Sequence, residues 1–215
     1  MPNRSALELP VGQGERLLLG AYQSEFRQRR AELRDRHSWK FERQQEFEEL
    51  DDSREAFCRG HWEEALRLLD EEREAHLKTA QRDRERGTAF HRVRVVEEPL
   101  TPYMQWELHA LRVQSEAGKE IRIVTPAALS SLEITGPLPE VVVVGGQVLY
   151  QVVYTEAGFL DGAIRFTDAE LTRRWESFIK ELYEAGEDLL SYFERRVAHL
   201  SPPPKPPKPP QPKAV

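Results

Sequence analysis

The chain has 215 residues, enough for one compact domain with extensions, and its 32% charged residues predict a modest core covered by charged helices. The formal net charge of −6 disfavours non-specific binding of nucleic acid, and no run of about 18 apolar residues predicts a membrane-spanning helix. The single cysteine, Cys58, allows no disulfide within the chain and suits a reducing compartment. We therefore expect a cytoplasmic protein.

Residues 1–37 are expected to form a helical extension. Four apolar side chains recur at helical spacing among many charges, which predicts a surface helix from Gly14 to Arg36 that lies on the core. They are Leu18, Tyr22, Phe26 and Leu33.

The next segment predicts one strand and two helices. Apolar and polar residues alternate from Trp39 to Arg43, which is typical of a short strand. Asp51 offers an N-cap side chain for a short helix that ends at Gly60. From His61 to Gly87, apolar residues three or four apart predict one long amphipathic helix.

A change of period then predicts a βαβ unit. FHRVRVV, beginning at Phe90, is a strand, and the segment from Pro102 to Gly118 has the pattern of a helix with proline in its first turn. KEIRIV, beginning at Lys119, is the second strand. This order predicts a parallel pair joined by a right-handed crossover.

Gly145-Gly146 raises the question of a phosphate-binding loop. Such a loop needs glycines between a strand and a helix N-terminus. Here the two glycines lie between EVVVV and QVLYQVVY, which are both strand-like, and no Lys-Ser or Lys-Thr pair follows the glycines. We therefore predict a β-hairpin with a type I′ turn.

The C-terminal part predicts a long helix followed by a tail. Asp168 lies in a capping box, and apolar residues then keep a 3.6-residue period as far as Val197, about eight turns. Residues 201–215, SPPPKPPKPPQPKAV, predict a disordered tail with polyproline II character. The expected organisation is a helical extension (1–37), an α/β domain (38–200) and this tail (201–215). The fold class is α/β, with a small mixed sheet that contains the βαβ unit and the hairpin and is flanked by long helices.

One spacing matches an enzyme signature. His76, Lys78 and Asp83 fit H-x-K-x4-D, the phospholipase D pattern, whose chemistry needs the first two side chains on one face of a strand. In a helix His76 and Lys78 point about 200° apart. We therefore expect no catalytic residue, and a divergent phosphodiesterase is the alternative.

The best candidate binding residues lie on the first strand of the βαβ unit and on the helix that follows it. Arg92 and Arg94 share one face of the strand, and Glu107 lies one helical turn after Tyr103. Ligands in open α/β sheets bind where a strand ends and the next helix begins. The candidates for binding a small anion or a partner are Arg92, Arg94, Tyr103, Trp106 and Glu107. The competing interpretation is a structural Arg–Glu107 salt bridge with the aromatic residues in the core. The six histidines have no metal-site spacing, so neither a metal nor a cofactor is expected.

Ser38 to Val197 resembles an uncharacterised bacterial family common in actinomycetes. The best-matched piece is RVRVVEEPLTPYMQWEL, which includes Arg92, Arg94 and Glu107. Members are often encoded near helix-turn-helix regulators, which implies transcriptional control and such a regulator as protein partner. The order of elements also resembles part of a phospholipase-D-like domain without its catalytic motif.

The expected function is a non-catalytic regulatory module that binds a small ligand or a protein partner. It is expected to bind neither nucleic acid directly nor a membrane. A further alternative is an adaptor recruited through the proline-rich tail, because PPKPP has the PxxP geometry that aromatic grooves accept.

Overall fold

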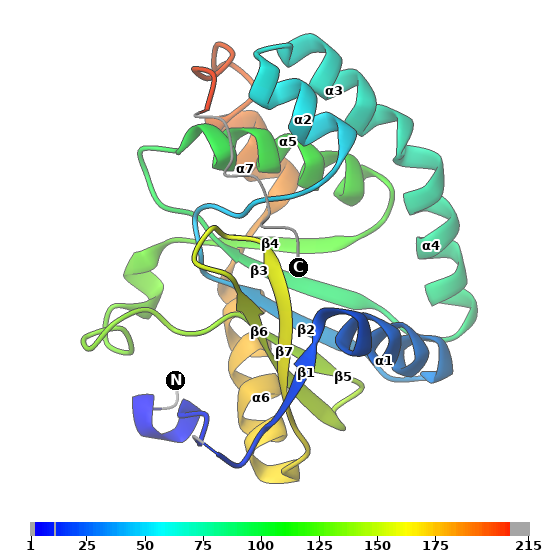
Figure 1. Ribbon diagram of the computed structural model, residues 1–215, viewed down its shortest axis with the longest axis vertical. Helices are drawn as coiled ribbons and strands as arrows, with labels where there is room; N and C mark the ends of the chain where they lie inside the picture. Colours follow the sequence, from blue (N-terminus) through cyan, green and yellow to red (C-terminus); the bar gives the residue numbers. More distant parts are fainter. Residues whose placement is uncertain (1–2, 11, 207–215) are drawn as a thin grey trace.

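The computed structural model describes residues 3–10 and 12–206. In this part of the chain one mixed sheet has the strand order β1-β7-β6-β5-β2-β3-β4-β8 (Figure 1). The strands are β1 Glu15–Leu18, β2 Ser38–Glu42, β3 Phe90–Val95, β4 Glu120–Val124, β5 Val141–Val144, β6 Val148–Tyr154, β7 Leu160–Phe166 and β8 Glu187–Asp188. The helices are α1 Leu19–Glu32, α2 Asp52–Arg59, α3 Trp62–Glu71, α4 Arg73–Glu85, α5 Pro102–Glu116, α6 Ala169–Ala185 and α7 Leu189–Arg196, with 3-10 turns η1 Arg4–Leu7 and η2 Pro126–Leu129.

The predicted α/β class, the βαβ unit and the hairpin are confirmed. Strands β2, β3 and β4 run parallel, and β3-α5-β4 is the predicted crossover. The hairpin joins β5 to β6 through Gly145 and Gly146, whose φ angles of 60° and 66° are those of a type I′ turn. A Cβ at Gly145 would lie 2.4 Å from Leu33 Cδ2, so any other residue there would also displace the Leu33 side chain.

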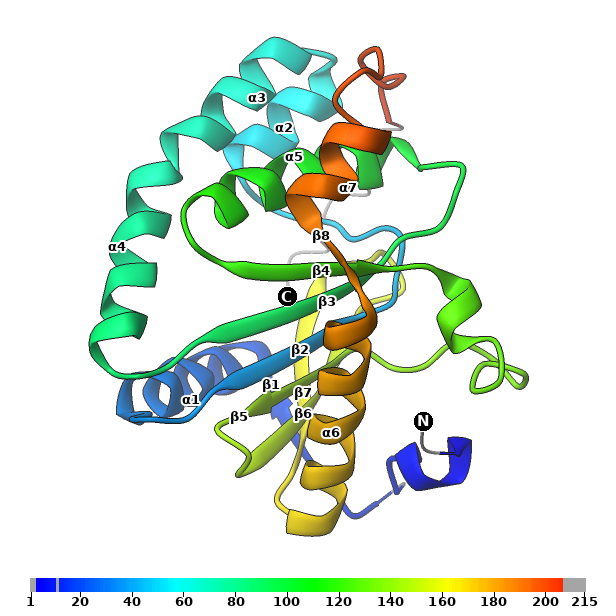
Figure 2. The ribbon, with the colours of Figure 1, turned by 180° about the vertical axis from the view of Figure 1, so that it is seen from behind.

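Helix α6 covers one face of the sheet (Figure 2). Its fully buried Phe178 lies 5.9 Å from the ring of Phe41 on β2, centroid to centroid. Alternate residues of β3, Val93 and Val95, complete this apolar layer.

The opposite face is covered in two separate parts. Helix α1 packs over β5, β6 and β7, where Tyr22 contacts Tyr150. Helices α5 and α7 pack over Ile121 and Ile123 of β4. Between these two parts, β2 and β3 present the charged residues Lys40 and Arg92. The sequence pattern predicts one core that includes Ile121, Val141 and Val152, but strand alternation places Val141 on the α6 face and Ile121 and Val152 on the opposite face.

The predicted N-terminal helix is wrong over its first turn. Glu15–Leu18 is strand β1, and Leu17 lies opposite Ala163 of β7. The strands approach so closely that a Cβ on Gly162 would lie 2.2 Å from the carbonyl oxygen of Leu17. Residues 1–37, which the sequence assigns to an extension, therefore contribute strand β1 to the main sheet and helix α1 to the layer that packs on it.

Two predicted long helices are each interrupted. The helix expected from His61 to Gly87 divides into α3 and α4 at Glu72, because the apolar stripe that packs on α5 ends at Leu69 and α4 buries only Ala80. The helix expected as far as Val197 ends at Ala185. There the chain passes around the edge of β4 as β8, and Asp188 then caps α7.

The end of the described chain follows α7 without regular secondary structure. Gln105 Nε2 donates a hydrogen bond to the carbonyl oxygen of Ser201, and Pro206 is buried. The prediction of a disordered tail concerns mostly residues 207–215, which lie outside the described residues.

Candidate anion-binding site

A cavity of about 680 Å³ lies on the face of the sheet between α1 and α4, over β2 and β3. We call it the cationic cavity. Its charged lining residues are Arg27, Arg30, Lys40, Arg82, Asp83, Arg86, Arg92 and Lys119. Its other principal lining residues are Tyr22, Phe26, Thr79, Phe90, Val142, Val152, Tyr154 and Leu160. The lining therefore contains seven cationic side chains and one acidic side chain.

The floor of the cavity is built by strand register. Arg92 of β3 lies opposite Lys40 of β2, and Lys40 lies opposite Val142 of β5. Side chains paired in this way project from the same face of a sheet. The floor therefore changes from charged over β3 and β2 to apolar over β5 and β6.

One wall is a stripe of α1 residues four apart, namely Tyr22, Phe26 and Arg30. The guanidinium of Arg30 lies 4.9 Å from the ring centroid of Phe90, and its Nη2 lies 2.8 Å from Asp83 Oδ2 on α4. This ion pair joins the two helices above the sheet, where α4 runs down one side of the molecule toward the end of α1 (Figure 1).

The other wall is one face of α4. Thr79, Arg82, Asp83 and Arg86 have the i, i+3, i+4, i+7 spacing that places side chains on the same side of a helix. Within the part of the chain that the structure describes, the guanidinium of Arg82 donates only to uncharged oxygens, those of Thr79 Oγ1 and the Lys78 carbonyl, both at 3.2 Å. It therefore retains donors that can reach an anion.

Lys119 closes the charged end of the cavity. Gly118 follows the C-cap of α5 at φ 95°, a left-handed conformation that turns the chain into β4 and places Lys119 just before that strand. Burial, followed by the positive charges of Arg92 and Arg30, lowers the pKa of Lys119 to about 8. The negative charge of an anion bound here would offset both effects by favouring the charged amine.

The cations of the cavity outnumber their partners. Glu42 pairs with both Lys40 and Arg92; burial alone would raise its pKa, but the charges of Arg92 and Lys40 lower it to about 2. Asp83 pairs with Arg30. Within the described residues, four cavity cations have no ion-pair partner, namely Arg27, Arg82, Arg86 and Lys119. This arrangement can hold a multiply charged anion.

Arg92 is the predicted site residue that lines the cationic cavity. Arg94 is instead completely buried, and its Nη2 lies 2.7 Å from Glu107 Oε2, which is the salt bridge of the competing interpretation. Tyr103 and Trp106 lie in the core beneath α2; Tyr103 donates to Glu49 at 2.5 Å and Trp106 donates to Ser53 at 3.0 Å. Trp106 and Glu107 also line a cavity of about 280 Å³ that shares Lys40 and Arg92 with the first.

The phospholipase-D-like triplet does not converge on one site. His76 and Lys78 both lie on α4, where Lys78 pairs with Glu74 and is 68% exposed. His76 lies 3.4 Å from Glu72, whereas Asp83 faces Arg30. The strand geometry that the signature requires is therefore absent from these residues.

Lys40, Lys119 and Arg82 are not among the binding-site residues predicted from the sequence. A signal was available for Lys40, which is a charged residue between Trp39 and Phe41 within a strand whose two faces are both covered. Lys119 and Arg82 carry no comparable signal, because their position depends on how α4 and α5 pack against the sheet.

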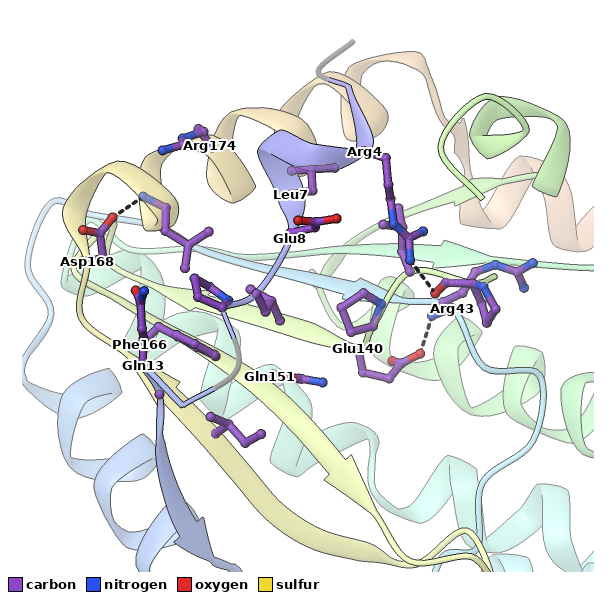
Figure 3. A pocket seen from close by; sticks show the side chains of 18 of the residues that line it. Arg4, Leu7, Glu8, Gln13, Arg43, Glu140, Gln151, Phe166, Asp168 and Arg174 are labelled. Atoms are coloured by element: carbon purple, nitrogen blue, oxygen red, sulfur yellow. Dashed lines mark hydrogen bonds between the residues drawn. The ribbon is translucent and has the colours of Figure 1, made fainter. Parts of the chain in front are cut away.

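A second cavity, of about 1690 Å³, lies beneath η1 on the face of the sheet that α6 covers (Figure 3). Among the described residues, three of its four lining cations have ion-pair partners: Arg16 pairs with Asp161, Arg174 pairs with Glu170, and Arg43 and Arg4 are described next. Arg43 pairs with Glu97 at 2.6 Å and Glu133 at 2.9 Å, and Arg4 donates to the carbonyl oxygen of Leu132 at 2.9 Å. Among the described lining residues, Arg4 is thus the one cation without an ion-pair partner, against four in the cationic cavity.

Glu140 is the unusual residue at this second cavity. Its Oε1 accepts hydrogen bonds from the backbone N–H groups of Arg43 and Gln44, at 2.5 and 2.7 Å, and it is 3% exposed (Figure 3 shows the first contact). Burial, followed by the charge of Glu42, raises the pKa of Glu140 to about 7.

Among the described residues, no group of His, Cys, Asp or Glu side chains has an arrangement suited to a metal ion. None of the described helices combines the length and apolar character needed to cross a bilayer.

Residues 24–194 match the family described as "Domain of unknown function (DUF6879)". The match covers most of the chain and includes every lining residue of the cationic cavity except Tyr22. No curated protein matches the chain.

Proposed function

We propose that this chain, which belongs to that family of unknown function, is a non-catalytic module that binds a small anionic ligand in the cationic cavity. The observation that carries the proposal is the group of four cations without ion-pair partners among the described residues. Charge-assisted hydrogen bonds from several such groups give an anion more stabilisation than neutral donors do. The cavity volume of about 680 Å³ lies in the range of small-ligand sites.

The binding would serve regulation rather than turnover. An anion in the cavity would contact α1, α4 and the strands β2 and β3 together, so its binding would stabilise one arrangement of these elements. The resemblance to proteins encoded beside helix-turn-helix regulators supports such a regulator as the partner that responds. The single cysteine supports a cytoplasmic setting.

Pyrophosphate titration by calorimetry tests the proposal. The double variant Arg82→Gln/Lys119→Gln removes two cations without ion-pair partners and leaves the pairs of Glu42 and Asp83 intact. We expect it to weaken pyrophosphate binding by about tenfold or more, since each charged hydrogen bond is worth about 1.5–3 kcal/mol.

Lys78→Gln is the matched control, because it removes a cation from the same helix outside the cavity. It should leave the affinity unchanged. Absence of pyrophosphate binding to the unmodified chain, or equal binding by the double variant, would contradict an anion site in this cavity.

A further inference from the structure

We infer that the ligand of the cationic cavity is a nucleotide, with its phosphates over Arg92 and Lys40 and its base over the apolar floor against Phe26. This inference rests on the proposed function, which requires only that the ligand be anionic. It follows from the way polarity changes along the cavity and from the aromatic residues at one end of it.

The charged half and the apolar half of the ligand would lie over neighbouring strands of the cavity floor. Lys40 on β2 lies directly opposite Arg92 on one side and Val142 on the other. Adjacent strands lie about 4.8 Å apart, so one small molecule can cover the charged row and the apolar row together. Val152 of β6 extends the apolar part.

The α1 wall changes polarity in the same direction as the floor. Tyr22 lies over β6, where its ring centroid is 5.3 Å from that of Tyr150. Arg30, two turns later, lies over Phe90 at the start of β3. Phe26 lies between them, with its ring centroid 6.4 Å from that of Tyr150 and 6.3 Å from that of Phe90. Along the floor and this α1 stripe, Arg92, Lys40 and Arg30 therefore lie toward one end, and Val142, Val152 and Tyr22 lie toward the other.

The apolar half is suited to a planar base. Phe26 and Tyr154 line it and are only partly buried, so their rings are not fully covered by the protein core. Stacking on an aromatic ring favours any base because every base has a π-face. An inorganic polyphosphate would occupy only the charged half and leave this surface uncovered.

The adjoining cavity of about 280 Å³ restricts where the phosphates can lie. It is lined by several carboxylates, including Glu48, Glu49 and Glu107. Their negative charge disfavours phosphates there. The phosphates are therefore confined to the side of Lys40 and Arg92 that faces Arg82 and Lys119.

The test compares nucleoside diphosphates with pyrophosphate, which has a similar anionic group and no base. ADP, GDP, CDP and UDP are titrated separately into the full chain by calorimetry. At least one of them should bind about tenfold or more tightly than pyrophosphate, as expected when a base stacks on an aromatic ring.

Phe26→Leu should remove this advantage by making that nucleotide bind about as weakly as pyrophosphate, and it should leave pyrophosphate binding unchanged. Phe26→Tyr, which keeps the ring, should restore the advantage. Tyr183→Leu is the matched control: Tyr183 is partly buried on α6, on the other face of the sheet, and the variant should alter neither ligand.

The outcomes separate this inference from the proposed function. If pyrophosphate binds as tightly as all four nucleotides, or if Phe26→Leu weakens both ligands equally, the nucleotide inference is wrong and the anion site stands. If neither pyrophosphate nor any nucleotide binds, both are wrong.

Discussion

Two arginines on the same face of β3 have different surroundings. Arg92 keeps 18% of its side chain exposed and faces the cationic cavity, whereas Arg94 is completely buried against Glu107. A buried ion pair is structural, because each charge needs the other to offset the loss of water. The sequence places both arginines on one face but does not show which of them a helix covers.

Breaking the buried pair should destabilise the fold. Glu107→Gln leaves the charge of Arg94 without its principal carboxylate, and we expect the free energy of unfolding to fall by about 3–5 kcal/mol. The double variant Arg94→Met/Glu107→Leu should recover part of this loss, because neither charge is then buried. Both values come from urea unfolding, and a loss below about 1 kcal/mol for Glu107→Gln would show that the pair is not buried as described.

Glu140 should make stability depend on pH in a direction opposite to that of most carboxyl groups. Its native pKa of about 7 lies above its ordinary value of 4.5. Between these values the native state holds a proton that the unfolded chain has lost. The contribution of this group to the free energy of unfolding is therefore fully present below about pH 4.5 and is lost as the pH rises through 7.

Glu140→Gln removes this titration and keeps an oxygen for the N–H groups of Arg43 and Gln44. The difference in the free energy of unfolding between the natural chain and this variant should fall from pH 5 to pH 8, as measured by urea unfolding at several pH values. Parallel pH profiles would mean that Glu140 titrates normally.

At the scale of elements, local patterns predicted the strands and the βαβ unit better than the helix boundaries. Alternation in FHRVRV and the proline in the first turn of α5 are local signals, and the structure agrees with them. The interruption at Gly186 is a tertiary effect: a Cβ there would lie 2.9 Å from Cβ of Arg122. Periodicity cannot show such an approach, so α6 and α7 read as one helix.

The same distinction between local pattern and tertiary packing explains which residues of the cationic cavity could be predicted. Arg92 could be predicted because its strand and the helix that follows are evident from the sequence. Arg30, Arg82 and Lys119 come from α1, α4 and the turn after α5, and only the packing of these segments brings them together. Their convergence could not be predicted from local pattern.

Helix α6 should contribute strongly to stability through Phe178. This side chain is fully buried between the helix and β2, so Phe178→Ala should lower the free energy of unfolding by about 3–5 kcal/mol in urea. Arg173→Ala, a change on the exposed side of the same helix, should alter it by less than about 0.5 kcal/mol. Similar effects of the two variants would mean that α6 does not pack on the sheet in this way.

At the scale of the whole molecule, the cationic cavity joins segments that are far apart in the chain. A ligand held by α1, α4 and the strands favours the native state over the unfolded chain, in which these segments separate. Pyrophosphate at about 100 times its dissociation constant should add about 2.7 kcal/mol to the free energy of unfolding. For a chain of this size the melting temperature should rise by about 5–10 °C. A rise of equal size in Arg82→Gln/Lys119→Gln would place the stabilising anion elsewhere.

The titration of Lys119 tests the anion site most directly. In protein with isotope-labelled lysines, the NMR signal of the Lys119 side chain is assigned by its loss in Lys119→Gln, and its pKa is measured with and without pyrophosphate. The free protein should give a pKa of about 8, and saturating pyrophosphate should raise it, since a bound anion favours the charged amine. A pKa that stays the same while pyrophosphate is bound would contradict a site against Lys119.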